Sequence, residues 1–130
     1  MNFKFFRAVS LIALFTSGPI SAWADIFIKD SNEIVGAWRL ESVAPGLEKP
    51  KITENRIWEF KADGTIITSG FNRHLGMEDR HEWKYQVANG KILADNPGRP
   101  GKPIEYIVYE KTNDTMILKG GIEGYYFFKK

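Results

Sequence analysis

The sequence contains no cysteine and two histidines in 130 residues, and this scarcity excludes much chemistry. Without cysteine there are no disulfides, no thiol nucleophiles and no thiolate metal ligands. The chain also lacks a Gly-x-Ser-x-Gly motif, a phosphate-binding loop and a dinucleotide fingerprint. We therefore expect a protein that is not an enzyme and that carries no cofactor.

The two histidines, His74 and His81, stand in a charged segment of the chain. A metal site would recruit both of them together with Glu78 or Asp79. Zinc requires three or four ligands that converge at about 2.0–2.3 Å. A His-x6-His spacing across an irregular loop does not predict such convergence, so we expect no metal site.

The sequence also lacks a hydrophobic run long enough to span a membrane. Its apolar run at 8–15 falls well short of the roughly 20 residues that a bilayer requires. The run follows Lys4 and Arg7 and precedes Ala-Trp-Ala at 22–24, the pattern of a signal peptide cleaved after a small residue. We therefore predict a signal peptide over 1–24, no membrane span after cleavage, and a periplasmic or secreted mature protein.

An excess of charge of either sign is missing as well. The net charge of +2 becomes zero when Lys4 and Arg7 leave with the signal peptide, because 16 basic and 16 acidic residues remain. A balanced domain has no overall field to attract a polyanion. We therefore expect no nucleic-acid partner.

What the sequence has in quantity is short runs rich in β-branched and aromatic residues, separated by Gly, Asn, Asp and Pro. This pattern predicts an all-β domain over 35–130, preceded by an arm over 25–34 that is either strand-like or a short helix capped by Asp30 or Ser31. Asp-Gly at 63–64 and Asn-Gly at 89–90 predict tight hairpin turns. The predicted strands are 35–44, 56–62, 65–70, 80–87, 91–95, 104–111, 115–119 and 125–129.

Eight consecutive antiparallel strands hide their edges by closing into an up-and-down barrel. Alternation along the strands then assigns one face to the barrel interior. Such an interior either holds one small ligand or is filled by its own aromatic rings, which bury about 150–250 Å² each. The side chains expected to contact a ligand there are Trp58, Phe60, His81, Trp83, Tyr85, Met116 and Leu118.

Several short motifs, in this order, resemble the small bacterial lipocalin-like domains of the calycin superfamily. They are Gly36-Ala37-Trp38, Trp58-x-Phe60-x-x-Asp63-Gly64-Thr65, Trp83-Lys84-Tyr85, Met116-Ile117-Leu118 and Tyr126-Phe127-Phe128-Lys129. The resemblance implies an eight-stranded barrel with Tyr126 and Phe128 pointing inward. It also implies that Trp38, after Gly36, plugs one end beneath a basic side chain of the last strand, Lys129 or Lys130. The chain departs from typical lipocalins in its short length, in lacking a C-terminal helix and in lacking a Thr-Asp-Tyr segment.

These observations leave two functions open. The first is a non-enzymatic carrier that holds a small hydrophobic or amphipathic molecule inside the barrel. The second is a protein-binding module, such as an inhibitor, an immunity protein or an assembly factor, that uses the loops 71–79 and 96–103. The loop 96–103 carries Arg99 and Lys102, although a plain connector is the simpler and favoured explanation for it. A homodimer through strands six to eight is a further expectation, based on an apolar outer face at Ile107, Tyr109, Tyr125 and Phe127.

Overall fold

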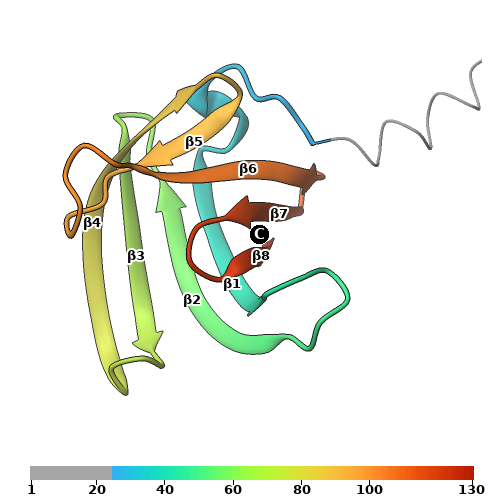
Figure 1. The fold of residues 1–130 in the computed structure, drawn as a ribbon, viewed down its shortest axis with the longest axis vertical. Helices are drawn as coiled ribbons and strands as arrows, with labels where there is room; N and C mark the ends of the chain where they lie inside the picture. The colour runs from blue at the N-terminus through green and yellow to red at the C-terminus, as the bar shows by residue number, and fades with distance from the viewer. Residues whose placement is uncertain (1–24) are drawn as a thin grey trace, which may run out of the picture.

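The computed structural model describes residues 25–130 and shows a closed barrel of eight antiparallel strands (Figure 1). Each strand pairs with the next along the chain, and β8 pairs with β1 to close the barrel. The predicted all-β, eight-stranded up-and-down barrel is confirmed, whereas the predicted signal peptide at 1–24 lies outside the described residues. The elements are the 3₁₀ helix η1 (Ser31–Glu33) and the strands β1 (Gly36–Ala44), β2 (Ile52–Phe60), β3 (Thr65–Asn72), β4 (Met77–Ala88), β5 (Lys91–Ala94), β6 (Ile104–Lys111), β7 (Thr115–Gly120) and β8 (Gly124–Lys129).

The largest difference from the predicted strands is the segment 71–79, which is a regular hairpin and not an irregular connection. Phe71 pairs with Glu78 and Asn72 with Met77, so that β3 and β4 extend almost to the turn. The Asn72 side-chain oxygen accepts hydrogen bonds from the next backbone N–H groups and shapes the turn at 73–76. The segment is polar and lacks alternation, so backbone pairing with the neighbouring strand decides its structure.

The strand β2 is also displaced from its predicted limits, since it begins at Ile52 and ends at Phe60 instead of covering 56–62. Its early residues pair with the end of β1, beyond a bulge between Leu40 and Ser42. A bulge adds a residue to one strand and re-aims the side chains that follow. A regular alternation pattern therefore cannot locate this part of the strand.

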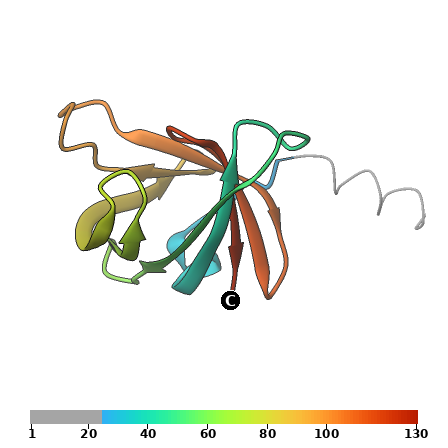
Figure 2. The ribbon, with the colours of Figure 1, turned by 90° about the horizontal axis from the view of Figure 1, so that it is seen from below.

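The up-and-down order places three connections at one end of the barrel and four at the other. The turns at 61–64, 89–90 and 112–114 lie at one end, together with the N-terminal arm. The other end, which we call the mouth, carries the connections 45–51, 73–76, 95–103 and 121–123. In Figures 1 and 2 the green connection at 45–51 and the tip of the β3–β4 hairpin stand apart from each other on the mouth side.

The arm at 25–34 seals the end opposite the mouth. It is both strand-like and helical, because Ile26 forms an isolated bridge to Val108 and η1 follows, capped by the Asp30 side chain. Ile28 and Ile34 of the arm are fully buried in the barrel core. These contacts extend the core past the first strand and close that end of the barrel.

Trp38 plugs the sealed end, as the lipocalin-like resemblance implied. The indole is buried, and its N–H donates to the carbonyl of Ile34 at 2.9 Å. Of the two expected lysines, Lys130 lies over the ring, with Nζ 4.7 Å from the ring centroid, and Lys111 Nζ approaches it at 5.8 Å. Lys129 is exposed because it follows the inward Phe128 and alternation turns it outward. Gly36 lies beside Lys130 Nζ, which would be 2.6 Å from a Cβ at that position.

Alternation assigned the inward faces of β1, β2, β4 and β7 correctly, whereas β6 and β8 are apolar on both faces and gave no assignment. The core combines residues of every strand with residues of the arm, and Trp58 and Trp83 pack against it. Trp58 lies 5.2–6.2 Å, centroid to centroid, from four other rings. The inward Tyr126 and Phe128 implied by the resemblance are buried among them. The barrel centre therefore holds a continuous aromatic cluster.

Candidate ligand-binding cavity

A cavity of about 520 Å³ occupies the mouth half of the barrel. This volume lies within the roughly 300–1,000 Å³ of small-molecule sites. The open and filled interiors expected from the sequence both occur, because the half of the barrel near Trp38 is packed and the half near the mouth is not. Its apolar wall is formed by Leu40, Trp58, Ile66, Trp83, Ala94, Ile104, Tyr106, Ile122 and Tyr126.

Three of the residues expected to contact a ligand line this cavity, namely Trp58, His81 and Trp83. Their strands carry them to the same height, since Trp58 pairs with Thr68 and Thr68 with His81. The His81 ring lies 5.5 Å from the Trp83 ring, and His81 is exposed at the mouth. These three side chains form one wall of the cavity.

The other four expected contacts point inward but lie outside the cavity, in the packed half of the barrel. Phe60 and Tyr85 meet edge to face at 5.5 Å, and the Tyr85 hydroxyl donates to the carbonyl of Lys61. Met116 and Leu118 are fully buried in the same core. These four residues therefore belong to the hydrophobic core and do not line the cavity. Alternation had placed them on the inner face, but it does not show how far along the barrel axis each residue lies.

Arg56 is the buried cation of the cavity, and the sequence analysis did not single it out. Its Nη1 donates to the Gly70 carbonyl at 2.9 Å and forms an ion pair with Asp79 Oδ1 at 2.8 Å. Its Nη2 lies 3.4 Å from the Thr68 hydroxyl. A buried charge is tolerated only when it is paired and hydrogen-bonded. Asp79 satisfies that condition here, so Arg56 and Asp79 form a neutral unit.

Asp79 is held in the ionised state by its neighbours. Asn72 Nδ2 donates to Asp79 Oδ2 at 2.7 Å and is the main cause that lowers the pKa of this carboxyl below its usual 3.8. Arg56 and His81, whose Nε2 lies 3.1 Å from Oδ2, lower the pKa further, and burial opposes them. The β3–β4 hairpin is thereby joined to β2 through a charged network.

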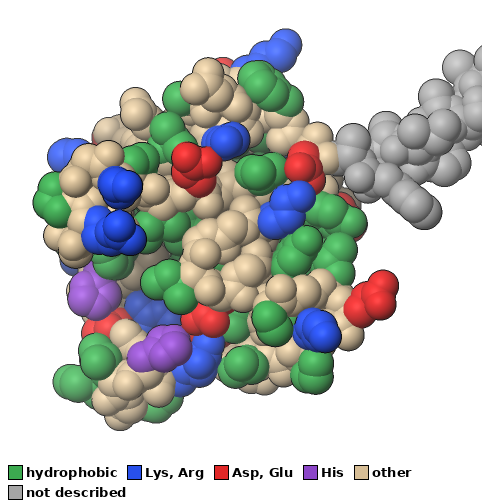
Figure 3. Space-filling model, in the orientation of Figure 1, with side chains coloured by type: hydrophobic (Ala, Val, Ile, Leu, Met, Phe, Trp, Pro, Cys, Tyr) green, Lys and Arg blue, Asp and Glu red, His purple; other side chains and the backbone are tan. Residues whose placement is uncertain are grey.

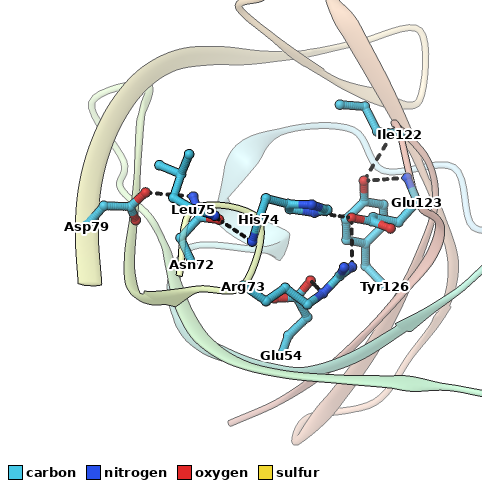
Figure 4. Close-up of polar contacts among 9 residues, drawn as sticks. All are labelled: Glu54, Asn72, Arg73, His74, Leu75, Asp79, Ile122, Glu123 and Tyr126. Carbon is cyan, nitrogen blue, oxygen red and sulfur yellow. Dashed lines mark hydrogen bonds and ion pairs between the residues drawn. The ribbon is translucent and has the colours of Figure 1, made fainter. Parts of the chain in front are cut away.

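A second network crosses the mouth between the β3–β4 turn, β2 and the β7–β8 turn (Figure 4). Arg73 Nε donates to Glu54 Oε2 at 2.8 Å, and Arg73 Nη2 donates to Glu123 Oε2 at 3.0 Å. His74 Nε2 lies 3.2 Å from the same oxygen of Glu123. The hydroxyl of Tyr126 accepts hydrogen bonds from the backbone N–H groups of Ile122 and Glu123, which positions the turn.

Glu54, His74 and Glu123 bring three ligand atoms within 4.8 Å of one another, the geometry of a candidate metal site. Arg73 already supplies a positive charge to both carboxylates, so a metal ion would have to displace it. The metal set considered from the sequence is also divided, because His81 contacts Asp79 in the other network. The donor set therefore fits an ion-pair network better than a metal ion.

A histidine and a carboxylate lie side by side at the edge of the cavity. His81 and Asp79 form a pair of the kind that activates a nucleophile, and Thr68 pairs with His81 across the strands. However, no hydrogen bond joins the Thr68 hydroxyl to His81 among the interactions of residues 25–130. The Thr68 oxygen instead faces Arg56 Nη2.

The outer face of β6 to β8, expected to form a contact patch, is partly covered by lysines. Lys51 Nζ lies 4.1 Å from the centroid of the Phe127 ring, and Lys119 Nζ lies 5.6 Å from that of Tyr109. Tyr109 and Tyr125 pack edge to face at 5.9 Å and are half-buried. The homodimer through this face stays a prediction.

Within 25–130 no helix combines the length and the apolar character needed to cross a bilayer. The loop at 96–103 borders a surface depression distinct from the mouth cavity, which it forms with Tyr85 and Leu93. Comparisons of the chain with family models, curated proteins and solved structures found no match.

Proposed function

We propose that this protein is an exported, non-enzymatic binding protein of the lipocalin-like type that holds one small hydrophobic or amphipathic molecule in the barrel mouth. The observation that carries the proposal is the cavity of about 520 Å³, sealed at its far end and lined mainly by aromatic and aliphatic side chains. Apolar walls with a few converging polar groups are the usual composition of ligand sites. Periplasmic or extracellular residence follows from the predicted signal peptide and is part of the same proposal.

The proposal is tested by titrating an apolar naphthalene fluorophore into the purified protein. We expect the probe to brighten on binding, and the fluorescence of the lining residues Trp58 and Trp83 to be quenched. Ala94→Phe adds a ring at a buried lining position and should abolish this signal. Ala37→Phe makes the same change at an exposed position on β1 and should leave it intact. Equal binding by both variants would contradict the assignment of the site.

The alternative function, a protein-binding module, is supported by apolar side chains at the rim of the mouth. Leu75 and Met77 on the β3–β4 hairpin are 62% and 58% exposed, and Ile122 on the opposite turn is 88% exposed. Figure 3 shows hydrophobic side chains at the lower left corner of the molecule, where the tip of the β3–β4 hairpin lies in Figure 1. Groups of exposed apolar residues often mark interaction sites.

This alternative makes a different prediction for the same preparation. Native mass spectrometry of the protein from its own source would show a stoichiometric protein partner that Leu75→Ser with Met77→Ser removes. A carrier would instead retain a small molecule, and the same double variant would keep it. The retained mass therefore decides between the two functions.

A further inference from the structure

The charge of the cavity carries an inference about its ligand, which rests on the function proposed above. Glu54, Asp95, Glu123 and Arg56 line the cavity, and Asp79 and Arg73 are bound directly to these residues. Four carboxylates against two guanidinium groups leave an excess of two negative charges when histidine is neutral. The excess is local, because the mature domain as a whole is balanced.

The buried guanidinium of Arg56 does not offset this excess for an incoming anion. Its charge is neutralised by Asp79 Oδ1 at 2.8 Å, and Nη1 also donates to the Gly70 carbonyl. An anionic ligand would have to approach this neutral pair past the carboxylates of the mouth. Such an approach is repulsive, and the repulsion is strengthened by the low dielectric of the cavity walls.

The two mouth carboxylates retain free acceptor atoms. Glu54 and Glu123 both contact Arg73 through Oε2, and Oε1 of each accepts no hydrogen bond within 25–130. The Glu54 side chain is only 7% exposed, so that its charge is poorly screened by water. One arginine therefore serves two carboxylates, one of which is nearly buried.

Aromatic rings line the same cavity as these carboxylates. Trp58, Trp83, Tyr106 and Tyr126 line the same cavity, and Trp58 packs edge to face against Tyr106 at 5.8 Å. The faces of such rings carry negative potential and attract cations. A ligand that enters with its apolar body on these rings would leave a charged end beside Glu54 and Glu123.

We infer that the cavity selects organic cations: ligands with an amine or quaternary ammonium group on an apolar body. The cationic end lies at the mouth, beside the carboxylates of Glu54, Glu123 and Asp95. The apolar body lies against Trp58 and Trp83. Neutral molecules of the same shape bind more weakly, and anions bind most weakly of all.

The test compares three ten-carbon amphiphiles below their micelle concentrations: decyltrimethylammonium, decanol and decanoate. Affinity is measured at pH 7.5 from displacement of the neutral naphthalene probe. We expect the cation to bind about tenfold more tightly than the alcohol and the anion to bind more weakly, with both differences shrinking at high salt. Equal affinities, or tighter binding of decanoate, would overturn the inference while leaving the proposed function in place. Failure of every amphiphile and of the probe to bind would refute the proposed function itself.

Variants assign the selectivity to the mouth carboxylates. Asp95→Asn removes one charge from a cavity-lining residue whose side chain forms no ion pair or hydrogen bond in the described part of the chain. We expect the ratio of cation to alcohol affinity to fall about threefold, and to fall further when Glu123→Gln is added. Glu59→Gln makes a matched change at an exposed position of β2 outside the cavity and should leave the ratio unchanged. An equal change in the Glu59 variant would show that the selectivity comes from total charge and would overturn the inference.

Discussion

The closure of the barrel by Trp38 leads to a quantitative prediction for Trp38→Phe. The substitution removes the indole N–H that donates to the buried carbonyl of Ile34 at 2.9 Å. Leaving a buried acceptor without its partner costs about 1–3 kcal/mol. The smaller ring also leaves a cavity in a fully buried position, which adds about 1 kcal/mol or more. We therefore expect the free energy of unfolding to fall by about 3 kcal/mol.

Urea unfolding followed by circular dichroism measures this change, because fluorescence would be altered by loss of the indole itself. In a domain of about this size, 3 kcal/mol corresponds to a fall of roughly 12 °C or more in the melting temperature. Lys130→Met is the matched control. It removes only the ammonium at 4.7 Å from the ring and should cost about 0.5–1 kcal/mol.

The same variant separates the plug from the ligand site. Trp38 does not line the mouth cavity, so the affinity of Trp38→Phe for the fluorophore should match that of the unmodified protein at temperatures where both are folded. A loss of stability below about 1 kcal/mol would refute the argument that this indole closes the barrel. A large loss of probe affinity in the folded variant would refute the division of the interior into a packed half and an open half.

Three further predictions concern pH and backbone geometry. Burial raises the pKa of Tyr106 and Tyr126 above 10, so these phenols stabilise the fold fully below pH 10 and lose that contribution as pH rises further, by up to about 1.4 kcal/mol per pH unit each; urea midpoints from pH 9 to 11 should fall less steeply in Tyr106→Phe. Because the pKa of Asp79 is lowered from 3.8, its ionised carboxyl stabilises the fold above pH 3.8, and this contribution is lost as pH falls below that value. Asp79→Asn should therefore be less stable than the unmodified protein at pH 7, and the difference should shrink in acid. Gly120→Ala should cost more than about 2 kcal/mol, because φ is +130° and its Cβ would lie 2.3 Å from the carbonyl oxygen of Glu105, whereas Gly76→Ala, with φ +71° and open space, should cost about 1 kcal/mol; chemical denaturation of the two variants compares them, and similar losses would contradict the steric argument.

The site residues show where sequence reasoning stopped. Trp58 and Trp83 were found because each alternates with charged neighbours, which marks an inward face. Arg56 lies on the same face of β2 as Trp58. A charged side chain is normally predicted to point toward solvent, so the sequence does not indicate that Arg56 is buried unless its partner is known. That partner, Asp79, belongs to another strand, and only the pairing of β2, β3 and β4 brings the two together.

The mouth network was equally hidden, because Arg73 and Glu123 are 50 residues apart in the chain. The sequence had marked His74 and its charged neighbours, but as candidates for a metal site with His81. The structure separates the two histidines into different networks, because His74 lies in the turn and His81 lies on the inner face of β4. Spacing along the chain does not reveal this, because the sequence of 71–79 predicts an irregular connection and not a hairpin.

By itself the sequence determined the class of the fold, the number and order of the strands, and the inward position of the aromatic side chains on β1, β2 and β4. These features depend on local preferences: alternation, turn residues and the need to hide strand edges. The tertiary structure alone decided which inward residues fill the core and which face open space, and which charges meet across the mouth. Those properties depend on height along the barrel and on contacts between distant strands, which are set by register and bulges and by no local pattern.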